Sequence, residues 1–271
     1  MNKYWFIFCG DEILLRIDET KLVLPFCETS PVAVYSGNMI TELPSMDGYV
    51  SCGLVFSCAP DIGDDYCFIS LRESYFHLSS EHYAMAGIVR QLSHWEQTSR
   101  YCPSCGSEMV RFDSIHGKRC PSCGNEAWPH ITPAVIVLVR RTDRHGHEQI
   151  LLVRAHNFKG DFHGLVAGFV EVGETLEECV VREVYEETRL KIKNIRYFGS
   201  QTWPYPSGLM VGFIADYYCG EIVVQDSELK SASWYTKDNL PKIPEKLSIA
   251  RRLIDFWLER QESNLRIIQE K

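Results

Sequence analysis

Residues 168–190 decide the fold of the C-terminal half of the chain, and they read GFVEVGETLEECVVREVYEETRL. The stretch from Leu176 to Arg189 predicts a helix whose apolar stripe, at 100° per residue, consists of Leu176, Cys179, Val180 and Val184. Glu183 and Glu187 fall inside this stripe, and Glu186 lies at its edge. A carboxylate on the buried face of a helix costs free energy unless something pairs with it, so the pattern indicates a functional site.

Convergent carboxylates on one helix face suit a hard divalent cation. Mg²⁺ typically takes carboxylates together with substrate phosphates. Arg182 can orient one of the glutamates through a fork-shaped pair of hydrogen bonds. The alternative interpretation is a solvated, Glu-rich helix face, which is the usual case for such helices, but the apolar stripe argues against it here.

A second pattern lies upstream, where two C-x-x-C pairs read Cys102-Pro-Ser-Cys105-Gly and Cys120-Pro-Ser-Cys123-Gly. Paired knuckles at this separation are typical of a zinc ribbon, in which four thiolates form a closed tetrahedral shell around one Zn²⁺ per chain. A closed shell leaves no position for substrate water, so we expect the zinc to stabilise the fold. The alternative is a pair of redox motifs, which rarely show this spacing.

The charge of the ribbon segment bears on a second role, because zinc ribbons also bind nucleic acid. Residues 99–128 hold four basic and three acidic residues, a net charge of +1: Arg100, Arg111, Lys118 and Arg119 against Glu108, Asp113 and Glu126. This balance gives only weak support for a nucleic-acid grip.

Composition narrows the remaining classes. The 271 residues carry a formal charge of −8 and are 45% hydrophobic, which is typical of globular proteins and argues against a broad basic surface for duplex DNA. The longest apolar run, Ala134–Val139, is far shorter than the roughly 20 residues of a membrane span, and no signal peptide is recognisable. Eleven cysteines, an odd number, predict reduced thiols and a cytoplasmic location.

Three domains are expected: a sheet-rich α+β domain over residues 1–98, the zinc ribbon over 99–128, and a C-terminal domain over 129–271. In the first, strands are predicted at 4–9, 13–15, 21–24, 32–35, 50–56 and 66–70. A helix over 80–97 follows, with a stripe of Ala84, Ile88, Val89 and Leu92. In the last, strands are predicted at 134–140, 149–154, 195–198, 209–218, 221–224 and 233–235, and a final helix at 247–262.

The glutamate helix resembles the Nudix box, G-x5-E-x7-R-E-U-x-E-E-x-G-U, where U is a bulky aliphatic residue. The matching residues are Gly168, Glu174, Arg182, Glu183, Val184, Glu186, Glu187 and Leu190. Arg189 is the single departure, because the family has Gly there. That position often needs a left-handed backbone, so Arg189 is expected to cost about 1 kcal/mol in strain. The departure removes no carboxylate.

The order of features is similar to the NADH pyrophosphatase (NudC-like) subfamily, in which a further N-terminal domain and a zinc ribbon precede the Nudix domain. That subfamily has the signature S-Q-P-W-P-F-P-x-S, and residues 200–208 read SQTWPYPSG, with Thr202, Tyr205 and Gly208 as departures. The resemblance covers nearly the whole chain, and the N-terminal third carries little of its specificity. It implies an α+β fold with a C-terminal α/β/α sandwich built on a mixed sheet.

The resemblance also implies a catalytic site for two or more Mg²⁺ or Mn²⁺ ions. The implied ligands are Glu183, Glu187, the backbone carbonyl of Ala167, and a late acidic residue for which Glu228 is the matching position. Asp226 is close enough in sequence to be the alternative, and a solvated turn carboxylate is the non-functional interpretation of either.

Two further box residues have implied roles. Glu186 is a further ligand or the base that orients water, and Glu174 supports Arg182 and the helix. His156 and His163 flank the loop before the box. His163 can approach a phosphate, although a solvated loop position is the more common role for such a histidine.

Flat apolar walls suit the planar rings of a dinucleotide. By resemblance, Phe169 and Trp128 sandwich the nicotinamide, with Trp128 supplied by the partner subunit of a homodimer. The implied substrate-binding residues are Phe169, Gln201, Trp203, Tyr205, Ser207, Trp128, Arg72 and the backbone of Ala250. Ordinary packing is the alternative for each aromatic, and solvation is the alternative for Arg72.

The leading functional hypothesis is therefore a Mg²⁺- or Mn²⁺-dependent enzyme that hydrolyses NADH or NAD⁺ to NMN(H) and AMP and also removes NAD caps from RNA 5′ ends. ADP-ribose or a diadenosine polyphosphate is the alternative substrate, because the signature is altered at Thr202 and Gly208. A non-catalytic nucleotide sensor is a third hypothesis, and the retention of every catalytic glutamate argues against it.

Overall fold

The computed structural model describes residues 1–35, 39–112, 116–156 and 160–259. The chain forms two compact units. The N-terminal unit contains residues 1–130 together with 203–207, and the C-terminal unit contains the chain on either side of that short segment, from residue 131 to 202 and from 208 onward. None of the helices in the described ranges combines the length and the apolar character needed to cross a lipid bilayer.

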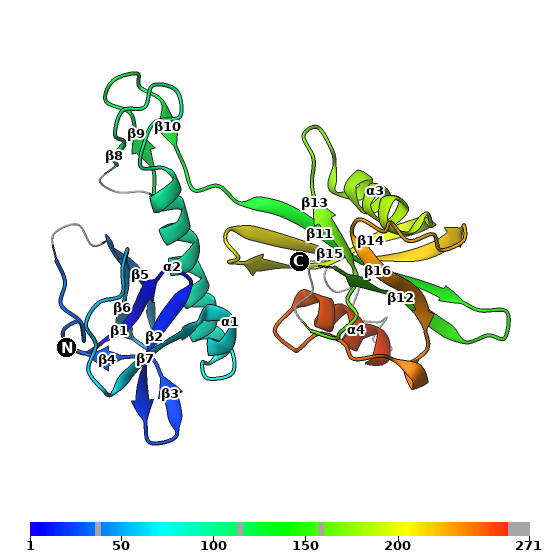
Figure 1. The fold of residues 1–271 in the computed structure, drawn as a ribbon, viewed down its shortest axis with the longest axis horizontal. Coiled ribbons are helices and arrows are strands. Elements are labelled where there is room, and N and C mark those ends of the chain that lie inside the picture. The colour runs from blue at the N-terminus through cyan, green and yellow to red at the C-terminus, as the bar shows by residue number, and fades with distance from the viewer. Residues whose placement is uncertain (36–38, 113–115, 157–159, 260–271) are drawn as a thin grey trace. The chain divides into compact units, whose positions relative to one another are not determined.

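The N-terminal unit is built on a seven-stranded sheet of order β3-β2-β1-β6-β5, with β4 beside β1 and β7 beside β2. β1 and β6 are parallel, whereas β1 and β2 are antiparallel. The strands are β1 (Lys3–Cys9), β2 (Glu12–Asp18), β3 (Lys21–Val23), β4 (Phe26–Cys27), β5 (Met39–Met46), β6 (Tyr49–Phe56) and β7 (Tyr66–Ser70). Figure 1 shows the long helix α2 running beside this sheet.

Two helices follow the sheet, α1 (Leu71–Ser74) and α2 (Ser80–Thr98). The predicted long helix is confirmed, and so is half of its predicted stripe, because Val89 and Leu92 are buried whereas Ala84 and Ile88 are exposed. Met85, Ala86 and Val89 are the residues that pack against the sheet.

The zinc-ribbon segment forms a three-stranded sheet of order β10-β9-β8. Its short strands are β8 (Val110–Arg111), β9 (Lys118–Arg119) and β10 (Glu126–Ala127). Lys118 is buried at the join to α2: its Nζ lies 2.7 Å from Glu96 Oε1 and donates to the backbone carbonyls of Glu96 and Ser99. This buried ion pair fixes β9 against the end of the helix.

The C-terminal unit has a six-stranded sheet of order β14-β15-β11-β12-β16, with β13 beside β11. β11 pairs in parallel with β15 and antiparallel with β12 and β13, so the predicted mixed sheet is confirmed. The strands are β11 (Thr132–Thr142), β12 (Glu148–Ala155), β13 (Val166–Phe169), β14 (Lys191–Trp203), β15 (Gly208–Cys219) and β16 (Leu229–Tyr235).

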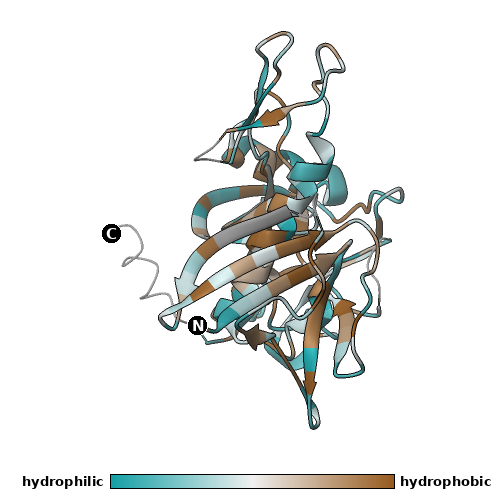
Figure 2. Ribbon diagram, turned by 90° about the vertical axis from the view of Figure 1, so that its left-hand side faces the viewer, coloured by the Kyte–Doolittle hydropathy of each residue, from teal (hydrophilic) through white to brown (hydrophobic). Residues whose placement is uncertain are grey.

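Helices cover both faces of this sheet, as the predicted sandwich requires. α3 (Leu176–Thr188) packs on the face formed by residues such as Val135 and Val137, and α4 (Ile249–Glu259) packs on the face of Ile136 and Leu138. The alternation follows from the period of two along β11. Figure 2 shows hydrophobic residues, drawn in brown, on strands of the sheets. A short 3-10 helix, η1 (Lys237–Asn239), precedes α4.

Several predicted elements differ from the structure. Residues 32–35 form no strand, and neither do residues 221–224, where the Val223 N–H donates to the carbonyl of Thr188, the last residue of α3. Three strands were not predicted. β4 is only two residues long, β5 contains Pro44, and β13 contains Ala167 and Gly168, which are poor strand formers. α4 begins at Ile249, and residues 260–262 of the predicted helix lie outside the described ranges.

The ends of α3 follow from local chemistry. Thr175 and Glu178 form a capping box at the N-terminus. At the other end Arg189 has φ 61°, the left-handed conformation expected at the family's glycine position, and its N–H donates to the Tyr185 carbonyl. The Arg189 guanidinium lies 5.2 Å from the centre of the Tyr185 ring.

Replacing Arg189 by Gly should raise the free energy of unfolding by about 1 kcal/mol, because Gly adopts a left-handed backbone without strain. Arg189→Ala is the matched control, since it loses the contact with Tyr185 but keeps a Cβ. Chemical denaturation of the three proteins measures the effect. Equal stability of the Gly and Ala variants would contradict a strain at this residue.

Candidate active site

The two carboxylates of the predicted apolar stripe are buried. Glu183 is 8% exposed and Glu187 is 5% exposed, and both project from α3 toward the sheet. Glu183 fits only because residue 168 is Gly: a Cβ added there would lie 1.8 Å from Glu183 Oε1. Gly168 at the start of the motif and Glu183 in its helix therefore depend on each other sterically.

Arg182 holds the carboxylates in place. Its Nε and one terminal nitrogen donate to the two oxygens of Glu174, at 2.7 and 2.9 Å. The other terminal nitrogen donates to Glu183 Oε1 at 2.9 Å and to Glu186 Oε2 at 3.1 Å. The bond from Arg182 lowers the pKa of Glu174 to about 2, so Glu174 is an ionised support for the guanidinium.

Glu187 has no such partner. Burial first, and then the nearby carboxylates of Glu183, Glu228 and Glu186, raise its pKa to about 8. Its Oε2 is buried without a hydrogen bond among the described residues. Burial also raises the pKa of Glu183, against the opposing effect of Arg182.

A hollow of about 260 Å³, here called the carboxylate hollow, opens beside Glu187. It brings three of the implied metal ligands together: Glu187, Glu228 and Ala167. Asp226, the alternative to Glu228, does not line it. The full lining is Val153, Ala155, His156, Leu165, Ala167, Glu187, Ser227, Glu228 and Leu229.

These donors fit a divalent cation of the Mg²⁺ or Mn²⁺ type. All of them are hard oxygen atoms, and mutually repelling carboxylates with a buried, unpartnered oxygen are stabilised by a positive ion. Carboxylates alone would instead take up a proton, as the raised pKa of Glu187 indicates.

His156 also lines the hollow, a role that the sequence did not predict. Its backbone N–H donates to the Glu228 carbonyl at 2.9 Å, and its Nε2 is 3.1 Å from the Asp226 carbonyl. His156 therefore fixes the turn that carries Glu228. The cause is the pairing of Ala155 in β12 with Leu229 in β16, which no local sequence signal reveals.

His163 is not the solvated loop residue that the sequence suggests. Its Nδ1 is buried and has no hydrogen-bond partner among the described residues, and its ring packs against Tyr235 at 5.8 Å. Burial lowers its pKa, so it is held neutral.

Gln201 and Ala250 meet at the start of α4. Gln201 Nε2 donates to the Leu247 carbonyl at 2.8 Å, and its Oε1 accepts from the Ile249 N–H at 2.6 Å. Both polar atoms of this side chain are thus engaged with the backbone that leads into Ala250, which is buried.

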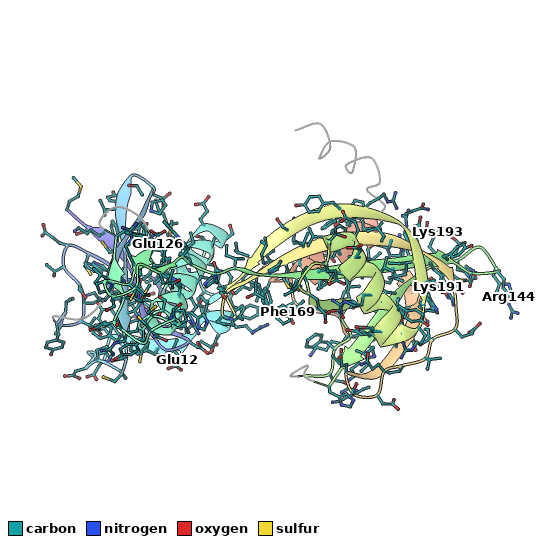
Figure 3. All side chains as sticks on the ribbon, turned by 90° about the horizontal axis from the view of Figure 1, so that it is seen from above. Glu12, Glu126, Arg144, Phe169, Lys191 and Lys193 are labelled. Carbon is teal, nitrogen blue, oxygen red and sulfur yellow. The ribbon has the colours of Figure 1, made fainter. Side chains whose placement is uncertain are left out.

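The other implied substrate residues divide between the two units. Arg72, Trp203, Tyr205 and Ser207 belong to the N-terminal unit, where Arg72 lies over the rings of Trp203 and Tyr205. Trp128 belongs to the same unit, is 43% exposed and packs against Phe112. Phe169 ends β13 in the C-terminal unit, where it is 63% exposed, and Figure 3 labels it beside α3.

The four cysteines of the ribbon converge, with all four sulfurs within 4.8 Å of one another. Two of the sulfur–sulfur distances are 3.6 and 3.4 Å, for Cys102–Cys123 and Cys105–Cys120. Four sulfurs at about 2.3 Å from a tetrahedral Zn²⁺ lie about 3.8 Å apart, so the cluster fits this ion. Hydrogen bonding with Ser107 lowers the pKa of Cys105 to about 6, which favours the thiolate.

The ribbon's basic side chains are all ion-paired within the described residues. Lys118 and Arg111 pair with Glu96, while Arg119 pairs with Glu126 and Arg100 with Glu108. Asp113 lies outside the described ranges. The pairing weakens the hypothesis of a nucleic-acid grip formed by this segment alone.

Comparison with known proteins agrees with this geometry. Residues 97–127 match the NADH pyrophosphatase zinc ribbon domain, and residues 130–256 match the NUDIX domain. The NAD-capped RNA hydrolase NudC of Vibrio vulnificus (strain CMCP6) is 35% identical over 262 residues, which are 96% of this chain and 95% of that protein. The chain belongs to the NudC-type Nudix hydrolases.

Two further comparisons place this NudC-type hydrolase. The NAD-capped RNA hydrolase NudC of Pseudomonas aeruginosa (strain LESB58) is 42% identical over 191 residues, 70% of this chain and 67% of that protein. The crystal structure of a NUDIX hydrolase from Nitrosomonas europaea superposes with a TM-score of 0.50 at 21% identity, over 60% of this chain and 92% of that one. The second likeness concerns the fold alone.

The raised pKa of Glu187 predicts a pH-dependent stability. Its ordinary pKa is 4.5 and its folded pKa is about 8, so the cation-free folded protein holds an extra proton between these values. The free energy of unfolding should therefore fall as the pH rises through this window, and Glu187→Gln should remove much of the fall. Thermal unfolding of zinc-loaded, Mg²⁺-free protein at several pH values measures it.

Glu186→Gln is the control for this experiment, because the Glu186 side chain is about half exposed and bound by Arg182. It should leave most of the pH dependence in place, because Glu186 is the smallest of the causes that raise the pKa of Glu187. Parallel profiles for wild type and Glu187→Gln would show that Glu187 does not titrate abnormally.

Loss of a zinc ligand should unfold the ribbon locally. We expect Cys120→Ser to bind less than one zinc per chain and to unfold at lower temperature, because the metal supplies folding free energy to this small sheet. Zinc content by atomic emission and thermal unfolding measure both effects. Cys58→Ser, at an exposed cysteine outside the ribbon, should match the wild type.

Proposed function

We propose that this protein hydrolyses the pyrophosphate bond of NADH or NAD⁺ to NMN(H) and AMP, and removes NAD caps from RNA 5′ ends. The observation that carries the proposal is the carboxylate cluster of α3 in a chain that aligns along almost its whole length with a NAD-capped RNA hydrolase. The carboxylate cluster accounts for metal-dependent hydrolysis of a pyrophosphate, and the alignment along almost the whole chain supports NAD-containing substrates.

The residues of the cluster have separable tasks. Bound divalent cations, held by Glu183, Glu187, Glu228 and the Ala167 carbonyl, would neutralise the pyrophosphate and make the attacking water more acidic. Arg182 keeps Glu183 and Glu186 oriented through its hydrogen bonds.

Glu186 is suited to accept the proton of the attacking water. Its side chain is 49% exposed, and Arg182 occupies one of its oxygens, Oε2. The second oxygen is available to the water. Water then adds to one phosphorus while the bridging oxygen leaves with the other phosphate, which gives NMN(H) and AMP.

We further propose a cytoplasmic homodimer in which Trp128 reaches the partner's site. The exposure of Trp128 supports this role, since its ring is packed by Phe112 on one side and remains 43% accessible. The cytoplasmic location is supported by the cysteines, since none of the eleven forms a disulfide in the structure.

A product assay tests the proposed reaction. With Mg²⁺ or Mn²⁺, we expect release of AMP and NMNH from NADH, and of NMN from NAD-capped RNA. Glu187→Gln should lower kcat at least about 100-fold, because the buried ligand is lost. Chromatographic quantification of both products measures the rates.

Glu177→Gln is the matched control, since Glu177 lies on the exposed side of the same helix and should leave kcat unchanged. The same assay with ADP-ribose and diadenosine tetraphosphate separates the alternative substrates. Faster turnover of either of these than of NADH would contradict the proposed specificity.

A further inference from the structure

The segment Trp203–Ser207, here called the signature loop, joins β14 to β15 but packs as part of the N-terminal unit. Three residues of α1 and α2 form its seat: Arg72, Tyr83 and Gly87. Arg72 and the loop belong to the residues that the sequence marks for substrate binding, whereas Tyr83 and Gly87 carry no such local signal.

Tyr83 makes the polar contact of the seat. Its hydroxyl is 2.5 Å from the hydroxyl of Tyr205, and burial is the main cause that raises the pKa of both tyrosines, so both stay protonated at neutral pH. The Tyr83 ring packs on the core of the N-terminal sheet, and Tyr75 meets it edge-on at 5.5 Å. The Tyr83 hydroxyl is thus held in place by a helix that packs on the sheet.

Arg72 and Gly87 complete the seat by shape. The Arg72 guanidinium lies 4.7 Å from the Tyr205 ring centre and 5.3 Å from that of Trp203. Opposite Pro204, a Cβ added at Gly87 would lie 3.3 Å from Pro204 Cγ. Any larger residue at position 87 therefore has to displace the loop.

These contacts change the role of Tyr205. Its hydroxyl is bonded to Tyr83, its ring is covered by Arg72, and its edge meets Trp203 at 5.0 Å. Tyr205 is therefore an anchor for the loop, and Trp203 and Ser207 are the loop residues left to meet a substrate.

We propose that Tyr83 is a positioning residue for substrate recognition: through Tyr205 it fixes the signature loop in the geometry that receives a dinucleotide. This inference rests on the proposed function, and it assigns a task to the N-terminal unit. Tyr83 touches no reacting atom, so its loss should weaken substrate binding and leave the chemical step intact.

Tyr83→Phe tests the inference, because it removes the hydroxyl and keeps the ring. In the full, zinc-loaded protein with Mg²⁺, we expect KM for NADH to rise about 5- to 10-fold while kcat stays within about twofold. Tyr205→Phe should have the same effect. The double variant should be no worse than either single variant, since both remove one bond.

Two further variants distinguish an effect on the position of the loop from an effect on folding. Tyr75→Phe changes the ring that meets Tyr83 edge-on and keeps that ring contact, so it should leave KM unchanged. Gly87→Ala pushes Pro204 without altering any hydrogen bond, and it should raise KM in the same direction. Zinc content and thermal unfolding temperature should match the wild type in every variant.

The outcomes are distinguishable. A wild-type protein that neither binds nor hydrolyses NADH would overturn the proposed function and this inference with it. Wild-type turnover of NADH with an unchanged KM in Tyr83→Phe would overturn the inference alone. Additive effects of Tyr83→Phe and Tyr205→Phe, or a loss of kcat with lowered unfolding temperature, would also overturn it.

Discussion

The burial of two carboxylates on α3 is the constraint on which the site depends. Glu183 and Glu187 are more than nine-tenths buried, and among the residues that the structure describes only Glu183 has a cationic partner, Arg182. The missing charge has to come from a proton or from a bound cation. Gly168 makes the burial sterically possible, and Arg182 makes it electrostatically tolerable. The same arrangement that costs free energy in folding creates the affinity for divalent ions.

Two segments of the N-terminal unit are held in place by contacts with α2: the zinc ribbon and the signature loop. The zinc cluster organises a segment too small to fold by its apolar core, and buried Lys118 couples that segment to α2. The same helix carries Tyr83, which holds the signature loop. The ribbon holds the C-terminal end of α2, and the sheet holds its N-terminal half. A helix fixed in this way is a suitable support for a recognition loop.

The sequence predicted the parts of the site whose residues are close together in the chain. The glutamates of α3 and the paired cysteines follow from helical period and knuckle spacing, and Arg189 was expected to be left-handed because of its place after the helix. His156 and Tyr83 could not be predicted, since their partners Glu228 and Tyr205 are brought near by strand pairing and by packing of a distant loop. The prediction of a strand at 221–224 was wrong, because these β-prone residues hydrogen-bond to the C-terminal end of α3 instead of joining the sheet.

If the carboxylate hollow exchanges a proton for a divalent cation, Mg²⁺ binding must release that proton. Calorimetric titration at pH 7 in two buffers of different ionisation enthalpy measures the number of protons released. With a Glu187 pKa of about 8, we expect release of close to one proton per chain, and none from Glu187→Gln. Mg²⁺ binding without proton release, or equal release from the variant, would contradict this exchange.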